Sequence, residues 1–187
     1  MTLHEIVLGI LLSLPPWHAD PQRESPEQRE VRLGVVATAI VDASNHATCH
    51  QRKCDPLWGR SREDLAALLI VQGWWESRYA LHVHQDKCRI KIGECDAGRA
   101  KSVWQVHASG PVSVKFWSTI GGVEQGPTLR AAWAATLVLS HAQSRCDTIQ
   151  GTIAMYATGR RCSWKGAADR YAMFQRFSER FADPSAK

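Results

Sequence analysis

The strongest evidence for the fold is one segment, Ser61–Tyr79, with the sequence SREDLAALLIVQGWWESRY. It reads as one amphipathic helix, and Ser61 with Asp64 makes a start that resembles a capping box. Four residues share one face, because positions i, i+4, i+7 and i+11 align in a helix: Leu65, Leu69, Gln72 and Glu76. Glu76 is therefore expected on a core-facing stripe. An ionised carboxylate there must be paired, protonated or used in chemistry.

Two interpretations of Glu76 are open. Trp74 and Trp75 would exclude water, and the last helical turn carries the negative end of the helix dipole, so both favour a protonated carboxyl. A carboxylic acid that keeps its proton is what a general acid for glycosidic cleavage requires. In the structural interpretation, Glu76 is a solvated cap or an ion-pair partner, with Arg60 and Arg78 near in sequence.

The rest of the chain predicts a mainly helical fold. Proline at the first helical position, apolar periodicity and a terminal glycine mark the segments. Helices are expected at about 26–44, 111–119, 127–145, 148–158 and 166–181. The irregular stretch 80–101, with its HVH and RIKI segments, predicts a small β-hairpin closed by Cys88 and Cys95.

The N-terminal region is expected to be separate from the main domain. Residues 5–14 are an apolar run, followed by a Pro-rich linker to residue 25, and residues 26–187 are expected to form a single domain. The run is shorter than the roughly 20 residues of a membrane span, so no stable membrane insertion is expected. It fits either a packing helix or the hydrophobic part of a secretion signal.

Composition narrows the class of partner without deciding it. The 187 residues carry a formal net charge of +5, which favours a polyanionic partner such as nucleic acid, anionic lipid or the bacterial wall. No run of like charges singles out nucleic acid, so nucleic acid is not expected as a partner. Eight tryptophans fit either helix packing or stacking on sugar rings.

Six cysteines, an even number, predict disulfides and an oxidising location. Pairing of sequence neighbours would give Cys49–Cys54, Cys88–Cys95 and Cys146–Cys162, although six cysteines allow about 15 connectivities. Free thiols are one alternative, and a zinc site is the other, with ligands from two clusters: Cys49, His50, Cys54, His82, His84, Cys88 and Cys95. The spacings match structural zinc motifs loosely, so no metal is expected.

Three short motifs follow one another along the chain. They are WESRY at 75–79, AKSVWQV at 100–106 and AMYATG at 154–159. Their order resembles the lysozyme-like superfamily, namely the soluble lytic transglycosylases and goose-type lysozymes. That signature is Glu-Ser with an aromatic residue, then a Gly-Leu-Met-Gln-like segment, then Ala-Tyr-Asn-x-Gly and a later Tyr. The resemblance covers about residues 62–175.

The resemblance implies a lysozyme-like α+β fold, helical with a small β-hairpin beside a glycan-binding cleft. It makes Glu76 the catalytic acid/base and implies substrate contacts for Ser77, Trp104, Gln105, Tyr156 and Tyr171. Ala157 replaces the usual Asn, and Val103-Trp104 replaces Leu-Met.

Four of these five substrate contacts also have an ordinary structural interpretation. Ser77 could bond the helix end, and Gln105 could satisfy a buried backbone group. Tyr156 and Tyr171 could be core aromatic residues.

The function that the resemblance implies is cleavage of the MurNAc-GlcNAc β-1,4 bond of peptidoglycan by an enzyme without a cofactor. A lytic transglycosylase giving 1,6-anhydro products is expected first. A hydrolytic lysozyme is one alternative, and a non-catalytic wall-binding protein is the other. Inverting hydrolysis would need a second carboxylate, for which Asp86, Glu94 and Asp96 are the candidates. A monomer that acts on glycan strands is expected, either periplasmic, secreted or associated with a phage virion or phage lysis.

Overall fold

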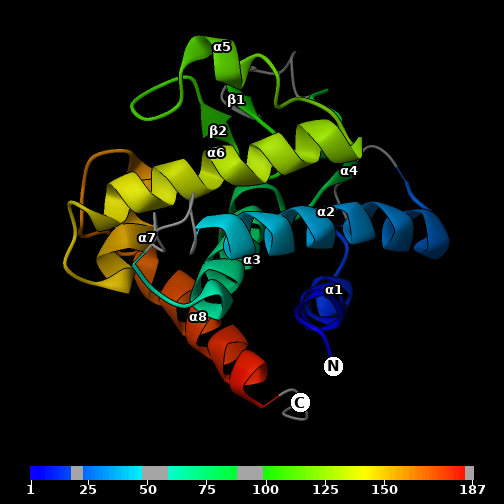
Figure 1. Cartoon of the computed structure of the whole chain (residues 1–187), viewed down its shortest axis with the longest axis horizontal. Coiled ribbons are helices and arrows are strands. Elements are labelled where there is room, and N and C mark those ends of the chain that lie inside the picture. Colours follow the sequence, from blue (N-terminus) through cyan, green and yellow to red (C-terminus); the bar gives the residue numbers. More distant parts are fainter. Residues whose placement is uncertain (18–22, 48–58, 88–98, 184–187) are drawn as a thin grey trace.

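The computed structural model describes residues 1–17, 23–47, 59–87 and 99–183. This part of the chain is mainly helical with a small two-stranded antiparallel sheet. The prediction of a mainly helical fold is therefore confirmed. Figure 1 shows the arrangement. In chain order the elements are α1 (Leu3–Ser13), α2 (Pro26–Ala47), α3 (Arg62–Ser77), α4 (Leu81–His84), β1 (Ala100–Lys101), β2 (Val106–His107), α5 (Val114–Trp117), α6 (Gln125–Gln143), α7 (Ile149–Thr158) and α8 (Ala167–Ala182).

Helix α3 lies at the centre of the molecule. Every residue from Leu65 to Gly73 is buried, because α3 is packed against α1, α2, α6 and α8. The predicted amphipathic stripe is therefore part of a helix that is buried on all sides over two turns. The helix is exposed to solvent in its first turn and again, in part, in its last turn, which carries Trp74, Trp75 and Glu76.

Hydrogen bonds confirm the predicted starts of α2, α3 and α7 and the predicted end of α7, whereas α2 ends later than predicted, at Ala47, and α5 is shorter than the predicted helix 111–119. The hydroxyl of Ser61 caps α3, and that of Thr148 caps α7. Ser25 and Gln28 form a reciprocal capping pair at the start of α2, with N–H···O distances of 3.2 and 3.0 Å. Helix α7 ends at Gly159, whose φ of 72° favours glycine.

Helix α1 packs into the main core. Val7, Ile10 and Leu11 are fully buried in the same cluster as the residues of α2 and α3. In this structure the apolar run is thus a packing helix, one of the two forms expected for it. Within the described part of the chain, no helix has both the length and the apolar character of a membrane span.

The β-hairpin among the described residues is formed by β1 and β2. Ala100 pairs with His107 and Lys101 with Val106, so the second sequence motif itself forms the hairpin. The prediction was wrong for His82-Val83-His84, which form the helical turn α4. The RIKI segment, Cys88 and Cys95 lie outside the described residues.

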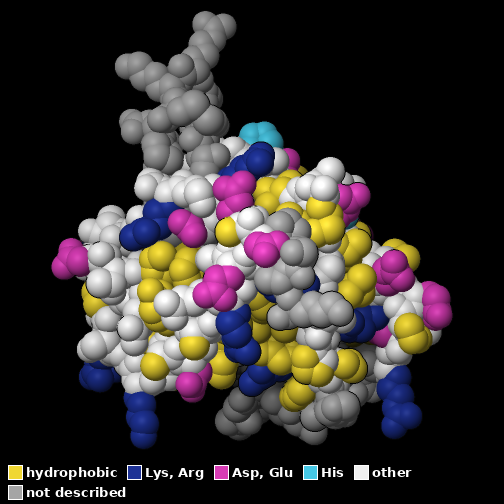
Figure 2. Space-filling view, turned by 90° about the horizontal axis from the view of Figure 1, so that it is seen from below, with side chains coloured by type: hydrophobic (Ala, Val, Ile, Leu, Met, Phe, Trp, Pro, Cys, Tyr) yellow, Lys and Arg dark blue, Asp and Glu magenta, His cyan; other side chains and the backbone are white. Residues whose placement is uncertain are grey.

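The predicted Cys146–Cys162 disulfide is present, with an S–S distance of 1.97 Å. It joins the residues before α7 to the loop before α8. The proposed Cys49–Cys54 and Cys88–Cys95 pairs fall outside the described residues. On the face seen in Figure 2, basic and acidic side chains are interspersed with apolar ones, so charges of both signs share this surface.

Candidate functional site

Glu76 forms an ion pair with an arginine on another helix. Nη1 of Arg170, on α8, lies 2.5 Å from Oε1 of Glu76. The side chain of Glu76 is 21% exposed and that of Arg170 is 8% exposed, so the carboxylate is partly accessible to water and the guanidinium is nearly buried. A cation at this distance stabilises the ionised carboxylate, which works against the neutral acid expected from the flanking tryptophans. The ion-pair interpretation of Glu76 is thus the one that the geometry shows, with Arg170 in place of Arg60 or Arg78.

Arg170 is held by the same helix that carries Glu76. Its Nη1 also donates to Oε1 of Gln72, 2.8 Å away, so one guanidinium nitrogen joins two residues of the predicted stripe. The guanidinium carbon lies 5.6 Å from the ring centre of Trp75 and 5.3 Å from that of Trp164. Both distances fall within cation–π range.

Donor groups without an acceptor surround this ion pair. Nε2 of Gln72, Nε1 of Trp75 and Nε of Arg170 are buried and have no hydrogen-bond partner among the described residues. A buried unpaired donor costs about 1–3 kcal/mol, so such groups favour acceptors. Hydroxyl and carbonyl oxygens, which are abundant in sugars, are acceptors of this kind.

Tyr156 connects the first and third sequence motifs to the second. Its hydroxyl donates to the carbonyl of Trp104 at 2.8 Å. Burial raises the pKa of Tyr156 well above its usual value, and the negative charge of Glu76 adds to that effect while Arg170 opposes it. The phenol therefore remains a neutral donor near neutral pH, within electrostatic reach of Glu76.

The turn of the hairpin positions Gln105 beside Tyr156. Ser102 and Gln105 both have positive φ, 63° and 48°, which reverses the chain tightly between β1 and β2. The amide nitrogen of Gln105 donates to the Ser102 carbonyl at 3.0 Å. Gln105 and Tyr156 line a cavity of about 500 Å³, together with Ala157 and two histidines, His107 and His141. A volume of this size accommodates a small ligand.

Trp104 and Ser77 have structural positions. Trp104 is fully buried, and its indole nitrogen donates to the Leu69 carbonyl at 2.9 Å. The prediction that Trp104 contacts a sugar is therefore corrected: it packs in the core. The hydroxyl of Ser77 donates to the Gly73 carbonyl at 2.8 Å and accepts from the Tyr79 amide at 3.0 Å, so Ser77 stabilises the helix end.

Tyr171 is a partly buried residue of α8. Its ring stacks on that of Phe174, with 6.0 Å between the ring centres, and packs against the core. Of the predicted residues, Gln105 and Tyr156 line one cavity together, and the charge of Glu76 acts on Tyr156, but Glu76 is not among the described residues that line that cavity. Among the proposed second carboxylates, Asp86 pairs with Lys101 at 3.7 Å, and Glu94 and Asp96 lie outside the described residues.

Arg170 is the site residue that the sequence analysis missed. It falls on the apolar stripe of α8, which continues with Met173, Phe174 and Phe177. An arginine on an apolar stripe is the same kind of signal that identified Glu76. Opposite charges on two core-facing stripes predict an ion pair, but they do not predict which helices meet.

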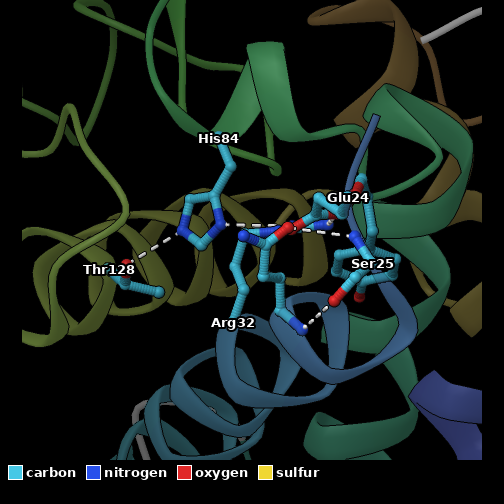
Figure 3. Close-up of polar contacts among 7 residues, drawn as sticks. Glu24, Ser25, Arg32, His84 and Thr128 are labelled. Atoms are coloured by element: carbon cyan, nitrogen blue, oxygen red, sulfur yellow. Dashed lines mark hydrogen bonds and ion pairs between the residues drawn. The ribbon is translucent and has the colours of Figure 1, made fainter. Parts of the chain in front are cut away.

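A second polar cluster holds the chain just after the site. Arg32, on α2, binds Glu24 through two nitrogens at 2.6 and 2.7 Å and donates to the Tyr79 carbonyl at 2.9 Å. Figure 3 shows His84 between Arg32 and Thr128. Its Nδ1 accepts from Arg32 at 3.4 Å, and its Nε2 donates to Thr128 at 2.9 Å.

His82 and His84 are the described members of the proposed zinc site. Both ring nitrogens of His84 are hydrogen-bonded, and His82 stacks on Trp17 with 5.4 Å between ring centres. Among the described residues no group of His, Cys, Asp and Glu side chains has the arrangement of a metal site. The cysteines proposed as ligands, and His50, lie outside them.

Comparisons with protein-family models, with characterised proteins and with solved structures find no significant match to this chain.

Proposed function

We propose that this protein cleaves the glycan strands of peptidoglycan, with Glu76 as the acid/base of a lytic transglycosylase. The observation that supports this most is the meeting of three motifs distant in sequence. Glu76 and Tyr156 are electrostatically coupled, and Tyr156 bonds the backbone next to Gln105. The cavity lined by Gln105 and Tyr156 gives room for a sugar beside Tyr156, and Glu76 is not among the described residues that line it.

The proposed reaction requires one residue to act in both directions. Protonated Glu76 gives its proton to the glycosidic oxygen as the bond to C1 of N-acetylmuramic acid breaks. The acetamido group of the substrate meets the positive charge at C1. Glu76, now ionised, takes the proton of the C6 hydroxyl, whose oxygen bonds C1 to close the 1,6-anhydro ring. Water in place of the C6 hydroxyl would give hydrolysis.

Arg170 has a defined place in this proposal. The ionised, arginine-paired Glu76 is the form suited to the second step, whereas the first step needs a proton on the same carboxylate. Substrate acceptors that draw the guanidinium away from Glu76 would allow protonation. The unpaired Nε of Arg170 and Nε2 of Gln72 are the donors nearest to such acceptors.

Loss of turbidity of purified cell walls tests the proposal. Glu76→Gln keeps the size and hydrogen-bonding capacity of the side chain but removes its acid/base function. We expect a rate at least about 100-fold lower, since general acid–base catalysis contributes about 10²–10⁴-fold. Glu63→Gln is the matched control, because Glu63 lies in the exposed first turn of the same helix. Equal clearing by wild type and Glu76→Gln would refute the role of Glu76.

The second candidate function is a wall-binding protein without catalytic activity. The Glu76–Arg170 pair favours it, because a carboxylate held by arginine serves as a structural link. Ala157, where the resembled families have Asn, also favours it. Sedimentation with purified walls separates the two candidates: binding without any release of soluble fragments by wild type would support the non-catalytic protein.

A further inference from the structure

An exposed tryptophan lies on the loop between α7 and α8. The side chain of Trp164 is 43% exposed, although the loop around it is tightly held. The Cys146–Cys162 disulfide anchors the loop, and the Thr158 hydroxyl accepts the Arg161 amide at 3.1 Å. The carbonyl of Trp164 accepts the amide of Ala167 at 3.0 Å, which joins it to the start of α8. Solvent exposure of this indole therefore does not come from a loose loop.

The indole ring has a fixed orientation. It lies directly on Gly166, so that a Cβ at this position would overlap its six-membered ring. Arg170 contributes a cation–π contact at 5.3 Å. Because Gly166 has a φ of −73°, its backbone suits any residue, and the close approach of Trp164 is what requires a glycine.

A cavity of about 680 Å³ opens beside this ring. Its polar lining combines two cations with hydroxyl and amide groups, and the described residues that line it include no Asp or Glu. The side chains that matter are Trp164, Arg161, Lys165, Thr148, Gln150 and Ser163. A flat aromatic face, hydrogen-bonding groups and positive charge together suit a sugar that bears a carboxylate.

We propose that this cavity is a saccharide subsite in which Trp164 stacks on a sugar ring while Arg161 and Lys165 bind its anionic substituent. The inference rests on the proposed function, and it names the part of the glycan that this surface takes: a carboxylate-bearing amino sugar. Arg170 links this subsite to the acid/base, since the same guanidinium contacts Trp164 and Glu76.

Binding to an inactive variant tests the subsite independently of catalysis. The Glu76→Gln protein is titrated calorimetrically with chitotetraose, which is neutral, and with a GlcNAc–MurNAc tetrasaccharide, whose lactyl groups are anionic. We expect Trp164→Ala to weaken both at least roughly five-fold, which corresponds to about 1 kcal/mol. Gly166→Ala should weaken both as well, because it displaces the indole without removing it. Arg161→Gln with Lys165→Gln should weaken only the anionic ligand, and less so at high salt.

Trp17→Ala is the matched control, because Trp17 is 38% exposed and stacks on His82 at another part of the surface. Its binding of both sugars should equal that of the Glu76→Gln parent. Unchanged binding in both Trp164→Ala and Gly166→Ala would overturn the subsite, even if the wild type clears cell walls. Weakened binding in those two variants would support the subsite, even if the wild type clears no walls and the proposed catalysis fails.

Discussion

The carboxylate of Glu76 contacts a guanidinium that is itself nearly buried. Two charges in this position attract strongly, but each has lost part of its hydration, so the pair holds the site in place more than it stabilises the fold. Gln72 binds the same nitrogen of Arg170, which fixes the guanidinium relative to two turns of α3. The proposed acid/base and its cation therefore behave as a unit, and a change in one alters the other.

Replacing Arg170 by methionine should expose this coupling. We expect the free energy of unfolding to fall by about 1.5–3 kcal/mol, the range for lost hydrogen bonds to a charged group. Urea denaturation measures this, with Arg176→Met on the exposed side of the same helix as the control. A free energy of unfolding equal to that of wild type would show that the contacts of Arg170 with Glu76 and Gln72 do not stabilise the fold.

The end of α3 is shaped by a tyrosine that folds back on the helix. Arg78 and Tyr79 have φ values of 53° and 52°, a left-handed pair that reverses the chain directly after Ser77. The Tyr79 hydroxyl then donates to the Ile70 carbonyl at 2.9 Å, with the ring lying against Gly73. This packing fixes the last turn of the helix and with it the direction of Glu76.

Two glycines inside helices should respond oppositely to alanine. At Gly73 a methyl group would overlap the Tyr79 ring, so Gly73→Ala should destabilise the protein by about 1–3 kcal/mol. At Gly34, in α2, a Cβ meets nothing within 4 Å, and Gly34→Ala should stabilise the protein by about 0.5–1 kcal/mol. Thermal and urea unfolding of both variants measure the contrast. Equal effects would contradict the proposed close contact.

The cluster around His84 joins three helices of the molecule. His84 comes from α4, Arg32 from α2 and Thr128 from α6, as Figure 3 shows. Burial first, and the neighbouring Arg32 second, lower the pKa of His84 from 6.5 to about 3. The folded protein thus holds this histidine neutral, and Arg32 is free to bind the Tyr79 carbonyl beside the site.

Stability should therefore fall with acid in a way that depends on His84. Between its unfolded pKa of 6.5 and its folded pKa of about 3, only the unfolded chain protonates this residue, so lowering the pH favours unfolding. The contribution reaches about 1.4 kcal/mol per pH unit. Urea unfolding from about pH 7 to about pH 4 should show a shallower dependence for His84→Gln than for wild type. Parallel slopes in the two proteins would contradict a buried, neutral His84.

The sequence was sufficient for features that depend on near neighbours. The caps of α2, α3 and α7, and the stripe ending at Glu76, follow from local hydrogen bonding and helical period. Arg170 was missed because its contact with Glu76 spans 94 residues, and no local pattern decides which helices meet. Trp104 was misassigned because burial of an indole depends on a distant acceptor, here the Leu69 carbonyl. The alternation of histidine and valine in HVH covers too few residues to distinguish a strand from one helical turn.

Mass spectrometry of soluble fragments from purified peptidoglycan shows whether the protein cleaves glycan strands and which sugar end it forms. If Glu76 is the acid/base of a lytic transglycosylase, wild-type protein releases fragments that end in 1,6-anhydro sugars, each lighter by one water than its hydrolytic counterpart. Glu76→Gln should then release none. Reducing ends would assign hydrolysis in place of the anhydro product. Identical fragments from both proteins, or none from the wild type, would contradict the account.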